Sequence, residues 1–171
     1  FISSSIVNEI SLFKDFSITF KPGEIWGILG PNGIGKTTLL HALAGLKKPQ
    51  AGKISLDQQN IYKIKPRERA KKIGLLLQNT EFSFPSTVLE TAMIGRFPHS
   101  KHWFNENLSD IDIAQKALEF VGIDHLINRS VMSLSGGEKR RLELAVILAQ
   151  HPEIYLLDEP TNHLDLQQKM K

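Results

Sequence analysis

Apolar and polar positions alternate in blocks along the chain, and the blocks predict strands separated by helices. Continuous apolar runs at residues 24–29, 73–77 and 154–157 are typical of buried strands. Apolar positions at helical spacing follow the first run at residues 38–44 and precede the last run at residues 136–150. Apolar strands that alternate with helices favour a parallel sheet covered on both faces. We therefore expect an α/β fold.

Shorter strand-forming segments lie in the first third of the chain. Residues 10–20 predict strands that end in a turn at residues 21–24, and residues 52–61 predict a short strand pair. A basic helix is expected at residues 66–72, directly before an apolar run. Trp26 lies in the first apolar run and is expected to pack in the core. Together these segments predict an antiparallel β subdomain beside the parallel sheet.

Two helices are predicted in the middle of the chain, where aromatic residues and prolines become frequent. Thr87 and Glu90 form a capping box for a helix over residues 88–95. Ser109 is expected to begin the second helix, which Gly122 ends. Its buried face is expected to carry Ala114, Ala117, Leu118 and Val121.

The composition limits the classes of protein to which the chain can belong. Its 171 residues, 41% of them hydrophobic and 23% charged, suit one soluble globular domain. No apolar run is long enough to cross a membrane, and the lack of cysteine suits the cytosol. The net charge of +3 is small and the basic residues are scattered, so no nucleic-acid partner is expected. The first residue is not Met and the last residues form a polar run, so we expect both ends to be trimmed.

A glycine-rich turn follows the first apolar run and fits the pattern Gly-x-x-x-x-Gly-Lys-[Ser/Thr]. Backbone N–H groups in such a turn point at a phosphate, and the dipole of the following helix favours negative charge there. Lys36 would reach the β- and γ-phosphates, and the Thr37 hydroxyl would ligate Mg²⁺. The chain is therefore expected to bind a nucleoside triphosphate. The predicted contacts are Gly30, Pro31, Asn32, Gly33, Ile34, Gly35, Lys36, Thr37 and Thr38.

Two acidic residues end the last apolar strand. Asp158 at the carboxyl end of a strand can hold Mg²⁺ opposite Thr37. Glu159 would face the γ-phosphate and orient or deprotonate the attacking water. The alternative is that both carboxylates only solvate the end of the strand. Beside a phosphate-binding loop, the magnesium and water-activating roles are the stronger interpretation.

A second glycine-rich helix start lies at Ser135, Gly136, Gly137 and Glu138. Ser135 and Glu138 form a capping box, which is an ordinary way to begin a helix. The two glycines lower helix stability at these positions and are not explained by capping. Exposed N–H groups at such a start can bind an anion, and one chain needs only one site for one γ-phosphate. This second start is therefore expected to bind the nucleotide of a partner chain.

These motifs, in this order, resemble those of the ABC-type ATPases. Residues 30–37 resemble the Walker A motif and residues 154–159 resemble Walker B. Gln78 resembles the glutamine of the Q-loop, residues 134–138 the signature motif, and residues 161–165 the D-loop. The resemblance implies two domains that hold two ATP molecules between them, with each signature helix completing the site of the other chain.

The resemblance also implies the fold and the roles of individual residues. The fold would be a P-loop NTPase fold with a doubly wound, mainly parallel sheet, truncated at its C-terminus. Residues 1–80 and 136–171 would form the nucleotide-binding core, and residues 81–135 an inserted α-helical subdomain. Catalysis would use Glu159, Gln78 and Lys36; Mg²⁺ would be held by Thr37, Gln78 and Asp158; and ATP would also contact Asp165.

Softer similarities to importers of iron–siderophore, haem or cobalamin type are found at residues 67–70, 87–90, 93–99 and 160–166. They imply an ATPase on the cytoplasmic face of the cell membrane that powers uptake through separate integral membrane permease subunits. A second copy of the chain would pair with it when ATP binds. The aromatic-rich residues 82–104 would supply the docking surface for the permease, or else pack within the helical insertion.

The chain departs from the family pattern in three places. The family's switch histidine lies downstream of the D-loop, beyond the end of this chain. The aromatic residue that stacks on adenine has no counterpart, since Ile6 or Val7 takes its place. Arg140 stands where the extended signature usually has Gln, in a basic turn with Lys139 and Arg141 that is expected to be solvated.

Three other functions remain open from the sequence. The chain could be a non-transport ABC ATPase that acts on DNA or ribosomes. It could also be a nucleotide-binding interaction module without turnover, which the missing switch histidine favours. A P-loop kinase is the weakest alternative, because it does not explain residues 135–137.

Overall fold

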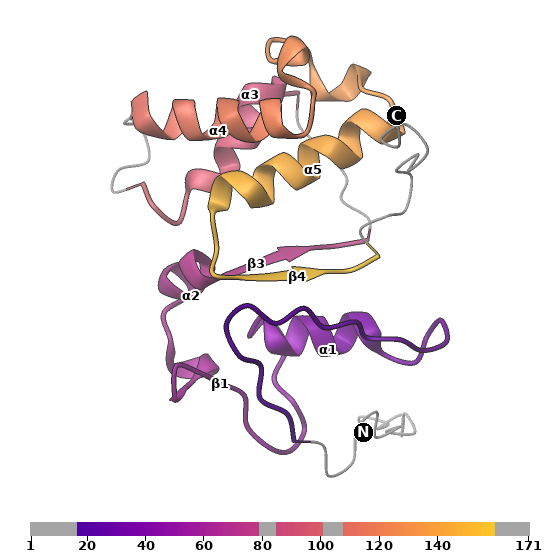
Figure 1. The fold of residues 1–171 in the computed structure, drawn as a ribbon, viewed down its shortest axis with the longest axis vertical. Helices are drawn as coiled ribbons and strands as arrows, with labels where there is room; N and C mark the ends of the chain where they lie inside the picture. The colour runs from indigo at the N-terminus through magenta and orange to yellow at the C-terminus, as the bar shows by residue number, and fades with distance from the viewer. Residues whose placement is uncertain (1–16, 79–84, 101–107, 160–171) are drawn as a thin grey trace, which may run out of the picture.

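A parallel pair of strands lies between two groups of helices in the computed structural model, which describes residues 17–78, 85–100 and 108–159. Helices α3, α4 and α5 lie on one side of the pair, and helix α1 lies on the other (Figure 1). The bounds of these elements are Lys36–Leu43 (α1), Ile73–Leu76 (β3), Val88–Met93 (α3), Leu108–Phe120 (α4), Gly136–Gln150 (α5) and Ile154–Leu157 (β4).

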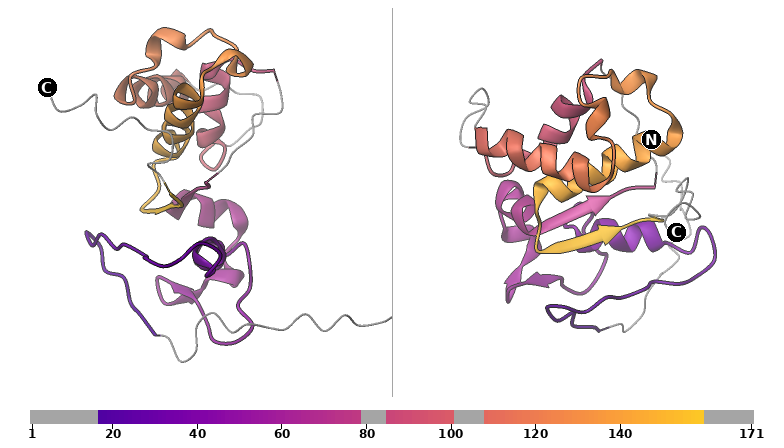
Figure 2. Two further views of the ribbon diagram at one scale, coloured as in Figure 1. Left: turned by 90° about the vertical axis from the view of Figure 1, so that its right-hand side faces the viewer. Right: turned by 45° about the horizontal axis from the view of Figure 1, so that its top comes forward.

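Strands β3 and β4 run parallel, with Ile73 opposite Ile154 and Leu76 opposite Leu157. Both arrows point the same way in Figure 1 and in the right-hand view of Figure 2. The pairing continues one step further, because the Asp158 N–H donates to the Leu76 carbonyl at 2.9 Å. The residues that follow the two strands are therefore brought to the same edge of the sheet.

Helix α5 carries the larger of two apolar cores. It packs against α3, α4 and β3, and its residues Leu142, Ala145 and Ala149 are fully buried. Gly95, in the short helix η2 (Ile94–Arg96), approaches α5 so closely that a Cβ there would overlap the Val146 carbonyl. The other buried members of this core are Val88, Ala92, Ala114, Ala117, Leu118, Ile123, Leu126, Val131 and Leu134.

The second core lies on the other face of β3. It joins Ala44, at the end of α1, to Ile73 in β3. Leu56 from β1 (Ser55–Leu56) and Ile61 also belong to it, and β1 pairs antiparallel with β2 (Gln59–Asn60). The remaining elements are η1 (Ile61–Lys63), α2 (Pro66–Lys72), η3 (Asp124–Leu126) and η4 (Val131–Ser133).

Most of the predicted elements are confirmed. The helix after the glycine-rich turn, the antiparallel pair within residues 52–61, the basic helix at 66–72 and both late apolar strands are present. The capping boxes at Thr87 and Ser135 are formed, and the turn after Lys21 closes with a bond from the Glu24 N–H. The subdomain boundaries at residues 80 and 135 stay a prediction.

The first apolar run, residues 24–29, is not a buried strand, so that prediction is wrong for the described structure. Ile25 is 100% exposed and Leu29 96% exposed. Trp26 does not pack in the core; it is 54% exposed, stacks edge-on against Phe20 and donates to Glu24 at 2.9 Å. An apolar run becomes a strand only where another strand pairs with it, and β3 and β4 pair only with each other within the described ranges.

Three smaller predictions also need correction. Strand β4 is not buried, since Ile154 and Leu157 keep about two fifths of their surface exposed. Ser109 does not precede its helix but lies in the first turn of α4, where Asp110 is buried in an ion pair with Arg96 at 2.7 Å. This tertiary contact outweighs the local capping preference. The expected strands at residues 17–20 are absent, and residues 10–16 lie outside the described ranges.

Within the described residues, no helix combines the length and the apolar character that crossing a bilayer requires.

Candidate nucleotide-binding site

The glycine-rich turn leads into α1 through two residues with left-handed backbone angles. Gly33 has a φ of 79° and Gly35, the N-cap of α1, has a φ of 103°. Residues with a Cβ are strained in this region, so the glycines allow the turn to close. Gly35 provides no side-chain cap. The N–H groups of the first turn of α1 are therefore left for water or a ligand.

The Lys36 side chain folds back over this turn. Its Nζ donates to the carbonyls of Gly30 and Pro31 at 2.9 and 3.0 Å. Both bonds are exposed, and an ammonium group gains more from a charged oxygen than from a neutral carbonyl. Lys36 is thus held at the mouth of the turn by partners that an anion can replace.

A cavity of about 370 Å³ opens at the start of α1. It is bounded on one side by the turn and the first residues of α1, and on the other by Gln78 and Glu159. The pairing of β3 with β4 explains this convergence, since Gln78 follows one strand and Glu159 the other. The lining residues are Asn32, Gly33, Gly35, Lys36, Thr37, Thr38, Gln78 and Glu159.

Thr37 and Asp158 meet at the inner edge of this cavity. The Thr37 hydroxyl donates to the Asp158 carboxylate at 2.6 Å, and Asp158 is only 4% exposed. Hydroxyl and carboxylate oxygens suit Mg²⁺, which usually takes one or two protein ligands and completes its shell with phosphate and water. Among the described residues no group of three or more His, Asp or Glu forms a metal cluster. The pair therefore fits a magnesium ion that a nucleotide also holds.

Gln78 and Glu159 contact each other on the side of the cavity opposite α1. The Gln78 amide donates to the Glu159 carboxylate at 2.7 Å. Glu159 adopts a left-handed backbone conformation with a φ of 47°. Such a conformation costs on the order of 1–3 kcal/mol for a residue other than glycine and persists where the surroundings enforce it. The position of this carboxylate is therefore fixed by its neighbours and not by local preference.

The second glycine-rich helix start lies away from this cavity. Ser135 and Gly136 are exposed, and a Cβ on Gly136 would meet open space. None of Ser135, Gly136 and Gly137 lines the cavity. The structure thus brings the phosphate-binding turn together with Gln78, Asp158 and Glu159, but not with residues 135–137. Asp165 lies outside the described ranges.

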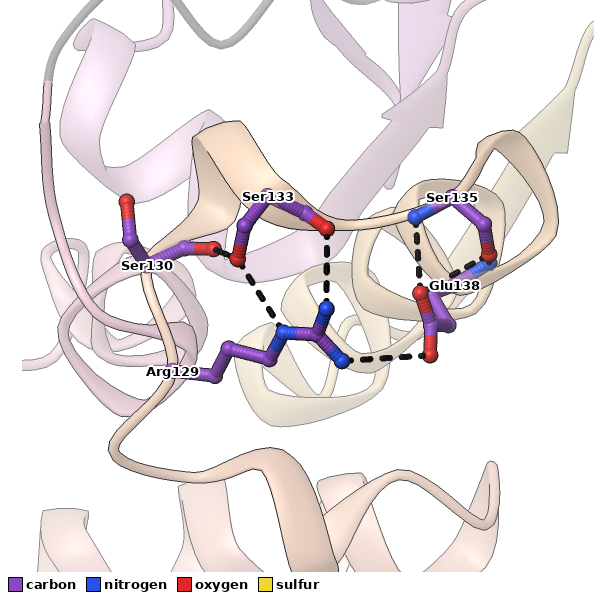
Figure 3. A network of polar contacts seen from close by, with 5 residues as sticks. All are labelled: Arg129, Ser130, Ser133, Ser135 and Glu138. Atoms are coloured by element: carbon purple, nitrogen blue, oxygen red, sulfur yellow. Dashed lines mark hydrogen bonds and ion pairs between the residues drawn. The ribbon is translucent and has the colours of Figure 1, made fainter.

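A network of polar contacts holds the start of α5 in place (Figure 3). The Glu138 carboxylate accepts the Ser135 N–H at 2.7 Å and the Ser135 hydroxyl at 2.8 Å. Arg129 lies 4.0 Å from the same carboxylate and donates to the Ser133 carbonyl at 3.2 Å. The Ser135 N–H and hydroxyl lower the pKa of Glu138, with smaller contributions from the positive charges of Arg129 and His125.

Two residues of this region were not identified from the sequence. Arg129 lies six positions before the N-cap Ser135 and contacts Ser133 and Glu138 at the start of α5 (Figure 3). No spacing pattern in the sequence indicates such a contact.

Arg140 was expected to be solvated and is instead 4% exposed, which corrects that prediction. Arg140 is not on the face of Leu142, Ala145 and Ala149. It lies three and seven positions before Glu143 and Ile147, which are also buried, so it belongs to a second buried face of α5. The signal for that face was the apolar spacing of Leu144, Ile147 and Leu148.

The comparison with known proteins agrees with this geometry. Residues 13–162 match the ABC transporter family. The chain is 42% identical over 156 residues to the hemin import ATP-binding protein HmuV of Myxococcus xanthus, covering 87% of this chain and 58% of that protein. It is 38% identical over 158 residues to the ferric enterobactin transport ATP-binding protein FepC of Escherichia coli, covering 92% of this chain and 58% of that one.

Solved structures show the same fold. An inward-facing structure of a transporter assigned to the metal-chelate ABC type aligns with a TM-score of 0.76 and 32% identity, over 92% of this chain and 58% of that one. A dimeric bacterial ABC transporter cassette aligns with a TM-score of 0.76 and 29% identity, over 91% of this chain and 69% of that one. The chain therefore belongs to the ABC transporter family, with the P-loop fold that the sequence predicted. It spans about 58% of the length of the two relatives named above.

The network around Glu138 predicts a pH dependence of stability. Because the folded-state pKa of Glu138 is lowered, its contribution is present above the ordinary glutamate pKa of about 4.3 and is lost as the pH falls through the folded value. The Glu138→Gln variant should be less stable than the parent at pH 7, and the difference should shrink below about pH 4.

Chemical denaturation from pH 7 to pH 3 measures this difference. Glu119→Gln, which removes one carboxylate near the end of α4, is the matched control for loss of a negative charge. A difference for Glu138→Gln that stays constant over the whole pH range would contradict the assigned role of the carboxylate.

Proposed function

We propose that this chain is the ATP-binding and ATP-hydrolysing part of an ABC importer for an iron–siderophore, haem or cobalamin type solute. The observation that carries the proposal is the cavity in which Lys36 and Thr37 face Gln78 and Glu159. The names of the relatives, a hemin import and a ferric enterobactin transport ATP-binding protein, support the class of solute.

In this proposal the triphosphate lies on the start of α1. Residues 30–38 other than Pro31 supply backbone N–H groups, and Lys36 exchanges its two carbonyl partners for phosphate oxygens. Thr37 and Asp158, with Gln78 as a further ligand, would hold Mg²⁺, which would supply positive charge to neutralise the phosphates.

Glu159 is the residue that acts on the attacking water. Its carboxylate lines the cavity beside the proposed γ-phosphate position and is already oriented by the Gln78 amide. Phosphoryl transfer requires a positioned nucleophile and charge neutralisation and little covalent chemistry from the protein. When water takes the place of the Gln78 amide at this carboxylate, Glu159 accepts its hydrogen bond and directs its oxygen at phosphorus.

The second glycine-rich start implies a partner chain. Ser135 and Gly136 are exposed and lie outside the chain's own cavity, so they are free to meet the nucleotide of a second copy. The dimeric cassette among the structural neighbours supports this arrangement. The chain would work at the cytoplasmic face of the membrane, docked on integral permease subunits.

Part of the predicted permease-docking stretch, residues 82–104, lies within the described ranges at 85–100. There Ile94 is 48% exposed and Phe97 is 59% exposed. Exposed apolar side chains on the helical region are compatible with a protein-binding surface.

Substitution of Lys36 tests the nucleotide assignment. Lys36→Ala removes a charged hydrogen-bond donor worth about 1.5–3 kcal/mol. The Kd for a fluorescent ATP analogue should therefore rise roughly 10- to 150-fold. Lys48→Ala, an exposed lysine beyond the end of α1, is the control and should bind like the parent. Equal affinities for all three proteins would contradict the phosphate-binding role of the turn.

Affinity purification of the full-length protein from its own membranes tests the transport assignment. An importer ATPase should retain an integral membrane protein in mild detergent, and its ATPase rate should respond to that partner. Recovery in a soluble complex with ribosomes or DNA, and no membrane partner, would instead favour a non-transport ATPase.

A further inference from the structure

Arg140 is a charged residue in the interior of the protein. It lies in the second turn of α5, shortly after Gly136 and Gly137, and is 4% exposed. A buried guanidinium is costly unless its donors are paired. The hydrogen-bond partners of the Arg140 guanidinium therefore indicate its role.

The guanidinium joins three parts of the molecule. One terminal nitrogen donates to the Leu77 carbonyl at 2.9 Å and to the Glu143 carboxylate at 2.6 Å. The other donates to the carbonyls of Glu159 at 3.0 Å and Asp158 at 3.3 Å. Arg140 thus links α5 to the segments that follow both strands of the sheet.

These carbonyls adjoin the two side chains that face each other in the cavity. Leu77 directly precedes Gln78, and Glu159 itself accepts a bond from Arg140. The sheet ladder between the two segments ends with the bond from the Asp158 N–H to the Leu76 carbonyl. Beyond that bond, the Arg140 guanidinium connects the two segments by binding the Leu77 carbonyl on one and the Glu159 carbonyl on the other.

The same contacts account for the unusual backbone of Glu159. Its φ of 47° is unfavourable for a residue with a side chain and needs support from its surroundings. Arg140 supplies that support by binding the Asp158 and Glu159 carbonyls, one before and one after the Cα atom of Glu159. The direction of the Glu159 carboxylate therefore depends on the placement of Arg140.

Arg140 does not act as a phosphate ligand. It is not among the residues that line the cavity, and its charge is balanced by the buried Glu143 carboxylate. Any effect on catalysis must pass through the groups that it holds.

We propose that Arg140 is a positioning residue that couples the glycine-rich start of α5 to Gln78 and Glu159. The proposal rests on the proposed ATPase function and extends it. A shift of the first turns of α5, when residues 135–137 meet the partner's nucleotide, is passed through one guanidinium to the residues that act on this chain's own nucleotide. Occupancy of the two sites is thereby linked within each chain.

Three variants of the full-length protein separate positioning from simple loss of packing. Arg140→Met removes the link without introducing a new donor, and leaves Glu143 buried without its partner. The double variant Arg140→Met/Glu143→Gln also removes that unpaired charge. Arg96→Met is the matched control, because Arg96 is a second buried arginine that binds α5 through the Ala149 carbonyl at 2.7 Å, at the end remote from the cavity.

Steady-state ATPase rates and nucleotide affinity give the first readout. Arg140→Met should lower kcat roughly 10- to 100-fold, the loss expected for a misplaced catalytic group. The Kd for a fluorescent ATP analogue should change less than about twofold, because the phosphate-binding turn is not touched. The double variant should regain thermal stability but not kcat, while Arg96→Met should lose stability and keep its kcat.

Hydrogen exchange of the nucleotide-free protein gives a second readout that does not require turnover. Peptides that cover residues 73–78 and 154–159 should exchange faster in both Arg140 variants and at the parental rate in Arg96→Met. Recovery of kcat in the double variant, or unchanged exchange in these peptides, would overturn the proposal. A parent protein that binds ATP without hydrolysing it would refute the proposed function, and the exchange experiment would then decide the role of Arg140 alone.

Discussion

The parallel pairing of β3 with β4 is the constraint on which the rest of the site depends. It brings the carboxyl ends of two apolar strands to one edge of the sheet. Gln78 follows one strand and Asp158 and Glu159 follow the other, so residues some eighty positions apart become neighbours. Asp158 then reaches Thr37 at the start of α1. One pairing of strands thus joins the glycine-rich turn, the oxygens proposed to bind the metal and the carboxylate proposed to act on water.

The two glycine-rich helix starts differ in a way that suits different roles. The start of α1 has no side-chain cap, and Lys36 binds only neutral carbonyls. The N–H groups of the first turn and the Lys36 ammonium can therefore bind an anion. The start of α5 already has its Ser135 N–H and hydroxyl occupied by Glu138. An anion that binds these two Ser135 groups must displace the Glu138 carboxylate. We infer that the first start binds nucleotide within the chain and that the second responds to a partner.

Local signals in the sequence predicted most of the helices and the candidate site. Capping boxes, glycine placement and apolar periodicity act over a few residues, and they located α1, α3 and α5 correctly. Predictions that required knowledge of distant partners were less successful. Residues 24–29 are apolar enough for a buried strand, but a strand also needs a neighbour to pair with. Arg140 has the charge of a surface residue, and its burial depends on four acceptors from three separate segments.

The most direct test of the account is a structure of the full-length Glu159→Gln protein with ATP and Mg²⁺. The account predicts a dimer in which Ser135 and Gly137 of one protomer lie within hydrogen-bonding distance of the γ-phosphate held at Lys36 of the other. A structure in which ATP occupies the turn while residues 135–137 of both protomers face solvent, distant from any nucleotide, would contradict it.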